Sequence, residues 1–112
     1  DQKIVGTLPD FGNFCIKRSA DGCAESYDRY KGTKELMPYA KGVSAKTYDF
    51  GEKGNCVETD YVKIMDILKE AGFSGYVGIE YEGSKISEEE GIRKTKALLE
   101  KVARQLKYKM VA

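Results

Sequence analysis

The stretch GYVGIEYEG at residues 75–83 decides the expected fold. Its tyrosine, valine and isoleucine favour a short buried strand, and Gly78 in the middle indicates that a backbone or ligand comes close there. Glu80 falls where this strand should end. In parallel α/β folds, ligands bind at the carboxyl ends of the strands. Glu80 is therefore the first candidate for chemistry, and the alternative is a strand-end carboxylate paired with a neighbouring lysine.

Alternating strands and helices are expected on both sides of this stretch. Two further strands are predicted at 3–8 (KIVGTL) and 42–48 (GVSAKTY). Residues 15–26 are polar and irregular and are interpreted as a surface loop. Apolar side chains at helical spacing, together with caps such as the Ser-Glu-Glu-Glu box at 87–90, predict helices at about 27–37, 60–71 and 87–107. The capping box explains the acidic run fully, so it receives no catalytic role.

This order predicts an α/β fold of three consecutive βα units with parallel strands and right-handed crossovers. The repeat length fits a (β/α)8 barrel, which needs about 250 residues. Three strands covered by one layer of helices would leave a bare sheet face and two open edges. We therefore expect the rest of a barrel, or self-association, to cover the sheet. The abrupt start at Asp1 suggests that an N-terminal part, with any export signal, is missing.

Composition excludes several classes of function. The chain of 112 residues has nineteen basic and eighteen acidic side chains and a net charge of +1. Nucleic acid and anionic membranes both demand a basic face, so neither is expected as a partner. No apolar run approaches the roughly 20 residues of a membrane span. Histidine is absent, which excludes a histidine-based triad and a histidine-rich metal site built from this chain alone.

Three cysteines, Cys15, Cys23 and Cys56, form no CxxC pattern. Their odd number does not indicate a disulfide framework. A Cys15–Cys23 bridge remains an alternative, but free thiols in a reduced compartment, and hence the cytoplasm, are the expectation.

Two more polar residues follow predicted strands or lie within them. Asp10 comes just after the first strand, where the alternative to a functional role is an Asx turn or a helix cap. Ser44 and Lys46 alternate with apolar residues in the second strand. If they point inward, a buried Lys46 needs an anionic partner such as Asp10, Glu80 or a substrate oxygen. The alternative is a lysine that extends its ammonium to solvent.

Three segments together resemble the sugar phosphate isomerase/epimerase family of the xylose isomerase-like TIM barrel superfamily. They are LPDFGNF at 8–14, YDRYKGTKELMPYAKGVSAKTYDF at 27–50 and GFSGYVGIEYEG at 72–83. The resemblance covers almost the whole chain in order. It implies that residues 1–112 form the C-terminal part of one barrel domain, with strands six to eight.

The resemblance also implies a divalent metal at the carboxyl face of the barrel. Asp10 matches a metal-binding aspartate of the family, and Glu80 matches a glutamate that both binds metal and shuttles a proton. Two family histidines are replaced here by Asn13 and Ser44. The remaining oxygen ligands suit Mg²⁺ or Mn²⁺ better than Zn²⁺. Asn13, Ser44 and Lys46 are expected to contact the substrate, and Lys46 is a candidate for the local cation if the metal is lost.

The implied function is sugar or sugar phosphate isomerisation or epimerisation, in which a proton moves next to a carbonyl through a metal-stabilised enediolate. Activity is not expected from these 112 residues alone, because part of the site would be missing. The alternative is a non-catalytic relative that binds a sugar or a partner and has lost the metal site.

Overall fold

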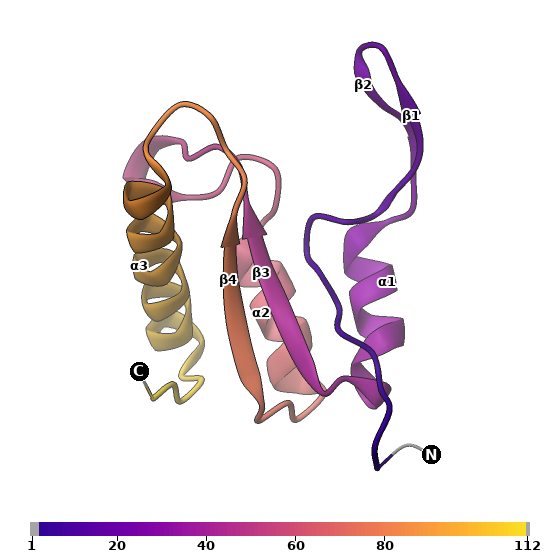
Figure 1. Cartoon of the computed structure of the whole chain (residues 1–112). Helices are drawn as coiled ribbons and strands as arrows, with labels where there is room; N and C mark the ends of the chain where they lie inside the picture. Colours follow the sequence, from indigo (N-terminus) through magenta and orange to yellow (C-terminus); the bar gives the residue numbers. More distant parts are fainter. Residues whose placement is uncertain (1–2, 112) are drawn as a thin grey trace.

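The computed structural model describes residues 3–111 and contains a hairpin, a parallel strand pair and three helices (Figure 1). Short 3₁₀ turns at Met37–Tyr39 and Glu52–Gly54 join the larger elements. In chain order the strands and helices are β1 Cys15–Ser19, β2 Gly22–Ser26, α1 Arg29–Leu36, β3 Gly42–Thr47, α2 Tyr61–Glu70, β4 Tyr76–Tyr81 and α3 Glu88–Leu106.

The predicted fold class is wrong. The described strands form two separate sheets of two strands each, an antiparallel pair β1–β2 and a parallel pair β3–β4. The chain is therefore not three consecutive parallel βα units, as strands six to eight of a (β/α)8 barrel would require. The strand expected at 3–8 is missing. Isolated parallel bridges, Thr7–Ala40 and Asp10–Ser44, join this part of the chain to the region of β3 instead.

The apolar residues of segment 3–8 fail to make a strand because nothing buries them. Ile4, Val5 and Leu8 are 82%, 67% and 67% exposed. Pro9 follows, and it has no N–H to donate to a ladder. Its carbonyl nevertheless accepts from the amide of Ser44 at 2.9 Å. The segment thus runs extended beside β3 without a continuous ladder.

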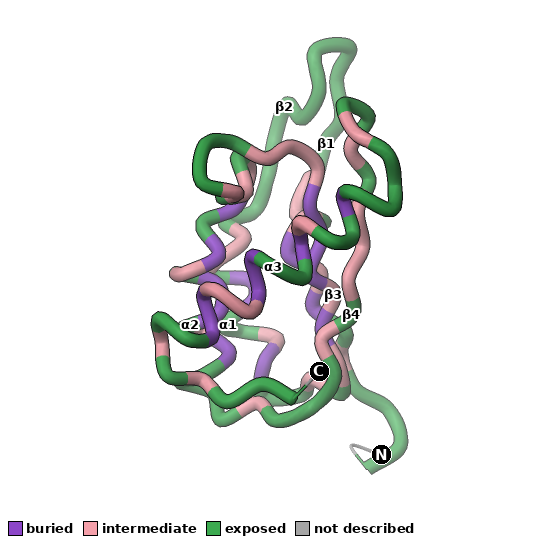
Figure 2. Tube along the Cα trace, turned by 90° about the vertical axis from the view of Figure 1, so that its left-hand side faces the viewer, coloured by how far each residue is buried: buried purple, intermediate pink, exposed green. Residues whose placement is uncertain are grey.

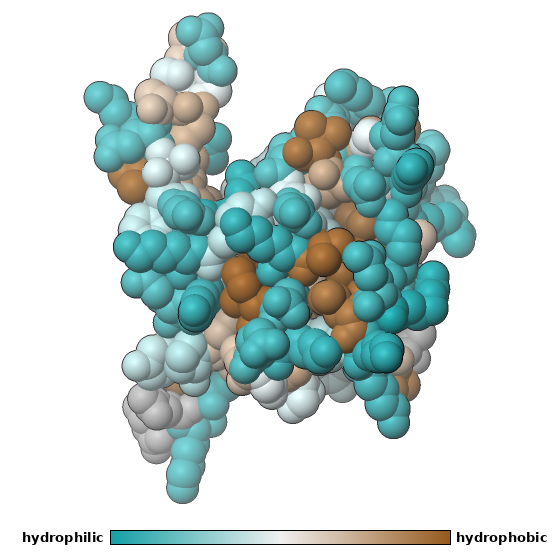
Figure 3. Space-filling view, turned by 180° about the vertical axis from the view of Figure 1, so that it is seen from behind, coloured by the Kyte–Doolittle hydropathy of each residue, from teal (hydrophilic) through white to brown (hydrophobic). Residues whose placement is uncertain are grey.

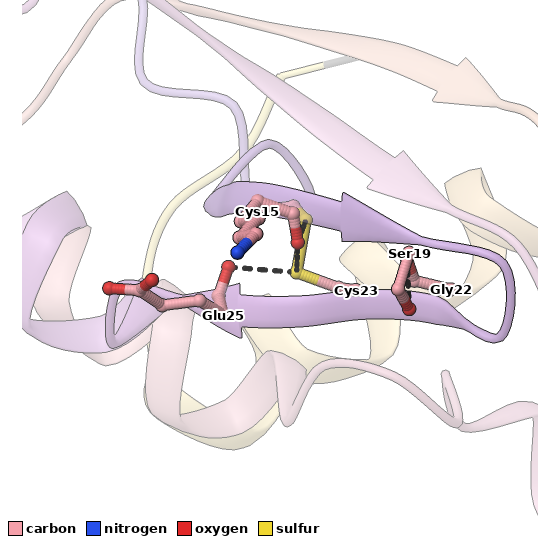
Figure 4. The surroundings of a disulfide bond; sticks show 6 residues. Cys15, Ser19, Gly22, Cys23 and Glu25 are labelled. Atoms are coloured by element: carbon pink, nitrogen blue, oxygen red, sulfur yellow. Dashed lines mark hydrogen bonds between the residues drawn. A yellow bond between two sulfur atoms is a disulfide. The ribbon is translucent and has the colours of Figure 1, made fainter.

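The polar stretch 15–26, expected to be a loop, folds into the β1–β2 hairpin. Gly22 adopts a φ of 120° at its turn, where other residues would be strained. Cys15 and Cys23 lie on the two strands of the hairpin and form a disulfide (Figure 4). The expectation of free thiols is therefore wrong for this pair, and Cys56 is the free cysteine of the described chain. Disulfides persist in oxidising surroundings, which argues against the reduced compartment expected from the sequence.

The three predicted helices are confirmed, with shorter bounds. Asp28 caps α1, Asp60 caps α2, and Ser87 caps α3 by accepting from the amide of Glu90 at 3.2 Å. Gly72 follows α2 with a φ of 71°, a left-handed conformation that favours glycine at the end of a helix.

The parallel pair β3–β4 has two different faces. Val43, Ala45 and Thr47 pair in register with Val77, Ile79 and Tyr81, and this face packs against the helices. Figure 2 shows that the helices and the strand pair form two layers. Ser44 and Lys46 lie on the other face, opposite Gly78 and Glu80. The core residues are Phe11, Met37, Val43, Ala45, Tyr61, Ile64, Met65, Leu68, Leu98, Leu99 and Val102.

Polar side chains cover most of the rear surface, with apolar groups showing between them (Figure 3). No helix in the described part of the chain combines the length and the apolar character that a bilayer span requires.

Candidate functional site

The candidate site lies at the carboxyl ends of β3 and β4, on the face away from the helices. The parallel register places Lys46 directly beside Glu80. The extended segment before β1 brings Asp10 to the same place, because Asp10 bridges to Ser44. Three segments that are far apart in sequence therefore contribute side chains to one cluster.

The ammonium of Lys46 is the centre of this cluster. Its Nζ lies 3.4 Å from Asp10 Oδ2 and 3.5 Å from both Glu80 Oε2 and Glu82 Oε1. It also donates to Asn13 Oδ1 at 2.9 Å. The Lys46 side chain is only 5% exposed. The structure therefore agrees with the interpretation of Lys46 as a buried lysine with anionic partners, and not with a lysine that extends its ammonium to solvent.

Burial lowers the pKa of Lys46, but the negative charges around it, led by Asp10, raise the pKa by more. The net result is a pKa above the ordinary lysine value, so Lys46 remains protonated. Three carboxylates against one ammonium give the cluster a net negative charge when all four groups are ionised.

Among the charged residues predicted for the site, the side chain of Glu80 is the most exposed and therefore the most accessible to a ligand. Its side chain is 43% exposed, whereas that of Asp10 is 14% exposed. Ser44 Oγ donates to Glu80 Oε2 at 3.0 Å. This hydrogen bond lowers the pKa of Glu80, with further lowering from its contacts with Asp10, Lys46 and Glu82. Glu80 is therefore held ionised, in one orientation, with solvent on its open side.

The loop at residues 10–13 packs against the side chain of Lys46. The Gly12 amide donates to Asp10 Oδ1 at 2.8 Å, so the Asx-type turn considered for Asp10 is also present. A Cβ at Gly12 would lie 2.9 Å from Lys46 Cγ and 2.8 Å from its Cδ. Glycine is thus required at this position because the lysine stem lies on its backbone. Tyr61 Oη donates to the Lys46 carbonyl at 2.7 Å and ties this part of β3 to α2.

The five residues predicted from sequence, Asp10, Asn13, Ser44, Lys46 and Glu80, all meet in this cluster. Glu82, Gly12 and Tyr48 were missed. Glu82 follows Glu80 by two residues, and a period of two places both on one side of an extended chain, so that signal was present in the sequence. Gly12 and Tyr48 carry no comparable local signal.

The donor set does not fit a metal ion as it stands. The Lys46 ammonium already occupies the point on which the three carboxylates and Asn13 converge. A divalent ion placed there would meet this fixed positive charge. Within residues 3–111, no group of three or more His, Cys, Asp or Glu is arranged to hold a metal. We derive no step through a metal, and the predicted divalent ion stays a prediction.

The chain matches no protein-family model and no curated protein. The resemblance to the sugar phosphate isomerase/epimerase family therefore stays a prediction, and the functional argument rests on the cluster itself.

Proposed function

We propose that this protein transfers a proton next to the carbonyl of a sugar or sugar phosphate, and so isomerises or epimerises it. The observation that carries the proposal is an ionised, half-exposed Glu80 fixed by Ser44 beside the buried ammonium of Lys46. A general base and a fixed positive charge side by side are what abstraction of a carbon-bound proton requires.

In the proposed step, the Glu80 carboxylate removes the proton from the carbon beside the carbonyl. The C–H electron pair moves into the new C=C bond, and the carbonyl π electrons move to oxygen to give an enediolate. The Lys46 ammonium stabilises the negative oxygen. The proton of the adjacent hydroxyl passes to the enediolate oxygen, so that the second oxygen becomes the new carbonyl. Protonated Glu80 returns its proton to the former carbonyl carbon, which completes an isomerisation.

Asn13 gives the ligand access to Lys46. Its amide oxygen is the nearest partner of the ammonium, at 2.9 Å, and Asn13 is an exposed loop residue. A ligand oxygen can replace that amide oxygen without breaking the contacts of Lys46 with Asp10, Glu80 and Glu82. Asn13 and Ser44 then act as positioning residues, and Glu80 and Lys46 act directly on the reacting atoms.

The test uses NMR to detect the exchange of sugar C–H protons with D₂O. It covers a panel of ketoses, aldoses and their phosphates. It is run without metal and with Mg²⁺ or Mn²⁺. We expect Glu80→Gln to reduce exchange by about 10²–10⁴-fold, the contribution of a positioned general base. The amide can still accept from Ser44, so the fold is retained.

Glu82→Gln is the matched control, because Glu82 lies at the same 3.5 Å from Lys46 but has no bond from Ser44. It should retain exchange within a few-fold. Equal losses in both variants would remove the assignment of Glu80 as the base. Sugar binding without exchange under any metal condition would replace the proposal with the non-catalytic binding function.

A further inference from the structure

A cavity lies between the β1–β2 hairpin and the start of α1. Its volume is about 580 Å³, within the range of small-molecule sites. The space-filling view shows the hollow between the protruding hairpin and the body of the molecule (Figure 3). Its walls include both disulfide cysteines, so the covalent bridge fixes one side of it.

Two residues, Gly12 and Tyr48, connect the cavity to the Lys46 cluster. Gly12 lines the cavity, and the aliphatic part of the Lys46 side chain lies on the Gly12 backbone. Tyr48 lines the cavity too, and its hydroxyl is within the electrostatic reach of Lys46, Glu82, Asp10 and Arg18. Gly12 and Tyr48 thus connect the cavity to the surroundings of Lys46.

The charge of the cavity is opposite to that of the cluster. Its walls carry the three cations Arg18, Arg29 and Lys63 against the single carboxylate of Asp28. That carboxylate is engaged, since it accepts from the amides of Tyr30 and Lys31 at the start of α1. A negatively charged group on a ligand is thus favoured in the cavity.

Each of these three cations still has N–H groups that can donate hydrogen bonds to a ligand. Arg29 uses one terminal nitrogen on Phe11 O and Thr59 Oγ1, which leaves N–H groups free for a ligand. The Lys63 ammonium lies 4.3 Å above the Tyr30 ring, a contact that uses no hydrogen-bond acceptor. Arg18 lies on the exposed hairpin, and none of the salt bridges in the described part of the chain involves it.

We propose that this cavity binds an anionic group, a phosphate or a carboxylate, on the sugar whose carbonyl end lies at Lys46 and Glu80. The assignment rests on the proposed function for the identity of the sugar end. It adds the substrate class: an acidic sugar rather than a neutral one, held with its charge toward Arg18 and its reacting carbons toward Glu80.

The experiment measures binding without turnover, by amide chemical shifts of the intact protein titrated with three ligands. Glucose 6-phosphate, glucuronate and glucose share a ring and differ in carrying a phosphate, a carboxylate or a neutral hydroxymethyl group. We expect either acidic ligand, or both, to bind about 10-fold or more tightly than glucose, as a charge-assisted hydrogen bond provides. Which acid binds better identifies the anionic group. Equal binding of all three overturns the proposal.

Two neighbouring hairpin residues give a matched pair of variants. Arg18 lines the cavity and Lys17 does not, yet Arg18→Gln and Lys17→Gln remove the same charge from the same strand. Arg18→Gln should weaken binding of the preferred acidic sugar by about 10-fold, and Lys17→Gln by less than about 2-fold. Equal effects would overturn the proposal. Because no turnover is measured, a failure here leaves the exchange result for Glu80 standing, and a failure of exchange leaves this binding result standing.

Discussion

The two strand pairs of this molecule are stabilised in different ways. In β3–β4, Val43, Ala45, Lys46 and Thr47 are buried and the helices cover one face. In β1–β2, every residue of β2 is exposed and a disulfide joins the strands. The first pair depends on packing, whereas the second depends on its backbone ladder and a covalent bond. Lys46 and Glu80 thus lie on the packed pair, whereas the disulfide-linked pair forms one wall of the neighbouring cavity.

The largest expected effect is on the packed pair. Ile64 of α2 is completely buried in the core that this pair shares with the helices, so Ile64→Ala should lower the free energy of unfolding by about 2–5 kcal/mol. The matched change in the hairpin is Ile16→Ala, where the side chain is 63% exposed, and it should stay within about 0.5 kcal/mol. Urea unfolding followed by circular dichroism measures both. Similar losses would mean that the hairpin folds as part of the core.

A smaller loss is expected from Lys46→Met, which leaves the partly buried Asp10 carboxylate without its cation. We expect about 1–3 kcal/mol at neutral pH, below the value for a fully buried pair because Glu80 and Glu82 are half-exposed. The loss should shrink as the pH falls through the lowered pKa of Glu80, because protonated Glu80 no longer attracts the ammonium.

The control for Lys46→Met is Lys96→Met, which breaks a surface pair with Glu100 and should change stability by about 0.5 kcal/mol or less. Adding Asp10→Asn to Lys46→Met should recover part of the loss. No recovery would show that the lysine stem, rather than its charge, stabilises the fold.

Removal of the disulfide should act on the hairpin and spare the core. Cys15→Ser with Cys23→Ser removes a crosslink of about 2–3 kcal/mol by loop-closure entropy, but the residues that it orders are exposed. Amide exchange should accelerate across β1 and β2, while the urea midpoint of the core changes little. Cys56→Ser serves as the control. Loss of core stability in the double variant would contradict the separation of the two strand pairs.

The smallest expected effect concerns the pKa of Glu80. Its folded value is lowered, so its stabilising contribution is present above the ordinary glutamate pKa and is lost as pH falls through the folded pKa. Ser44→Ala removes the hydrogen bond that contributes most to the lowering and should move the pKa upward, toward the ordinary value. An NMR titration of the Glu80 carboxyl carbon measures this shift. An unchanged pKa would assign the lowering to Lys46 and the other neighbours instead.

The helices and the site residues were predictable from the sequence, whereas the arrangement of the strands was not. Helical periodicity and caps such as Ser87 are local signals, so α1, α2 and α3 were predicted with small errors in their bounds. The strand at 3–8 failed because apolar composition does not reveal whether another element will bury it. The hairpin was missed because exposed strands lack the alternation on which strand prediction depends.

The cluster was predictable because each member carried a separate signal. Glu80 ended a strand, Lys46 alternated with apolar residues, and Asp10 followed a predicted strand end. Their meeting point depends on the parallel register of β3 with β4 and on the bridge from Asp10 to Ser44. The cationic cavity depends on the hairpin and its disulfide, so no argument from the expected fold could have found it.

The enclosure of Lys46 by carboxylates also determines its reactivity as an amine. Its raised pKa keeps the proton on Nζ well into the alkaline range, and the nitrogen therefore lacks a free lone pair at neutral pH. Such a lysine cannot attack a carbonyl to form an imine. Acylating reagents should modify the exposed lysines first and Lys46 last, and borohydride should trap no sugar on the protein. In the proposed reaction the sugar would therefore keep its oxygen throughout, and the protein would contribute charge and proton transfer without a covalent bond.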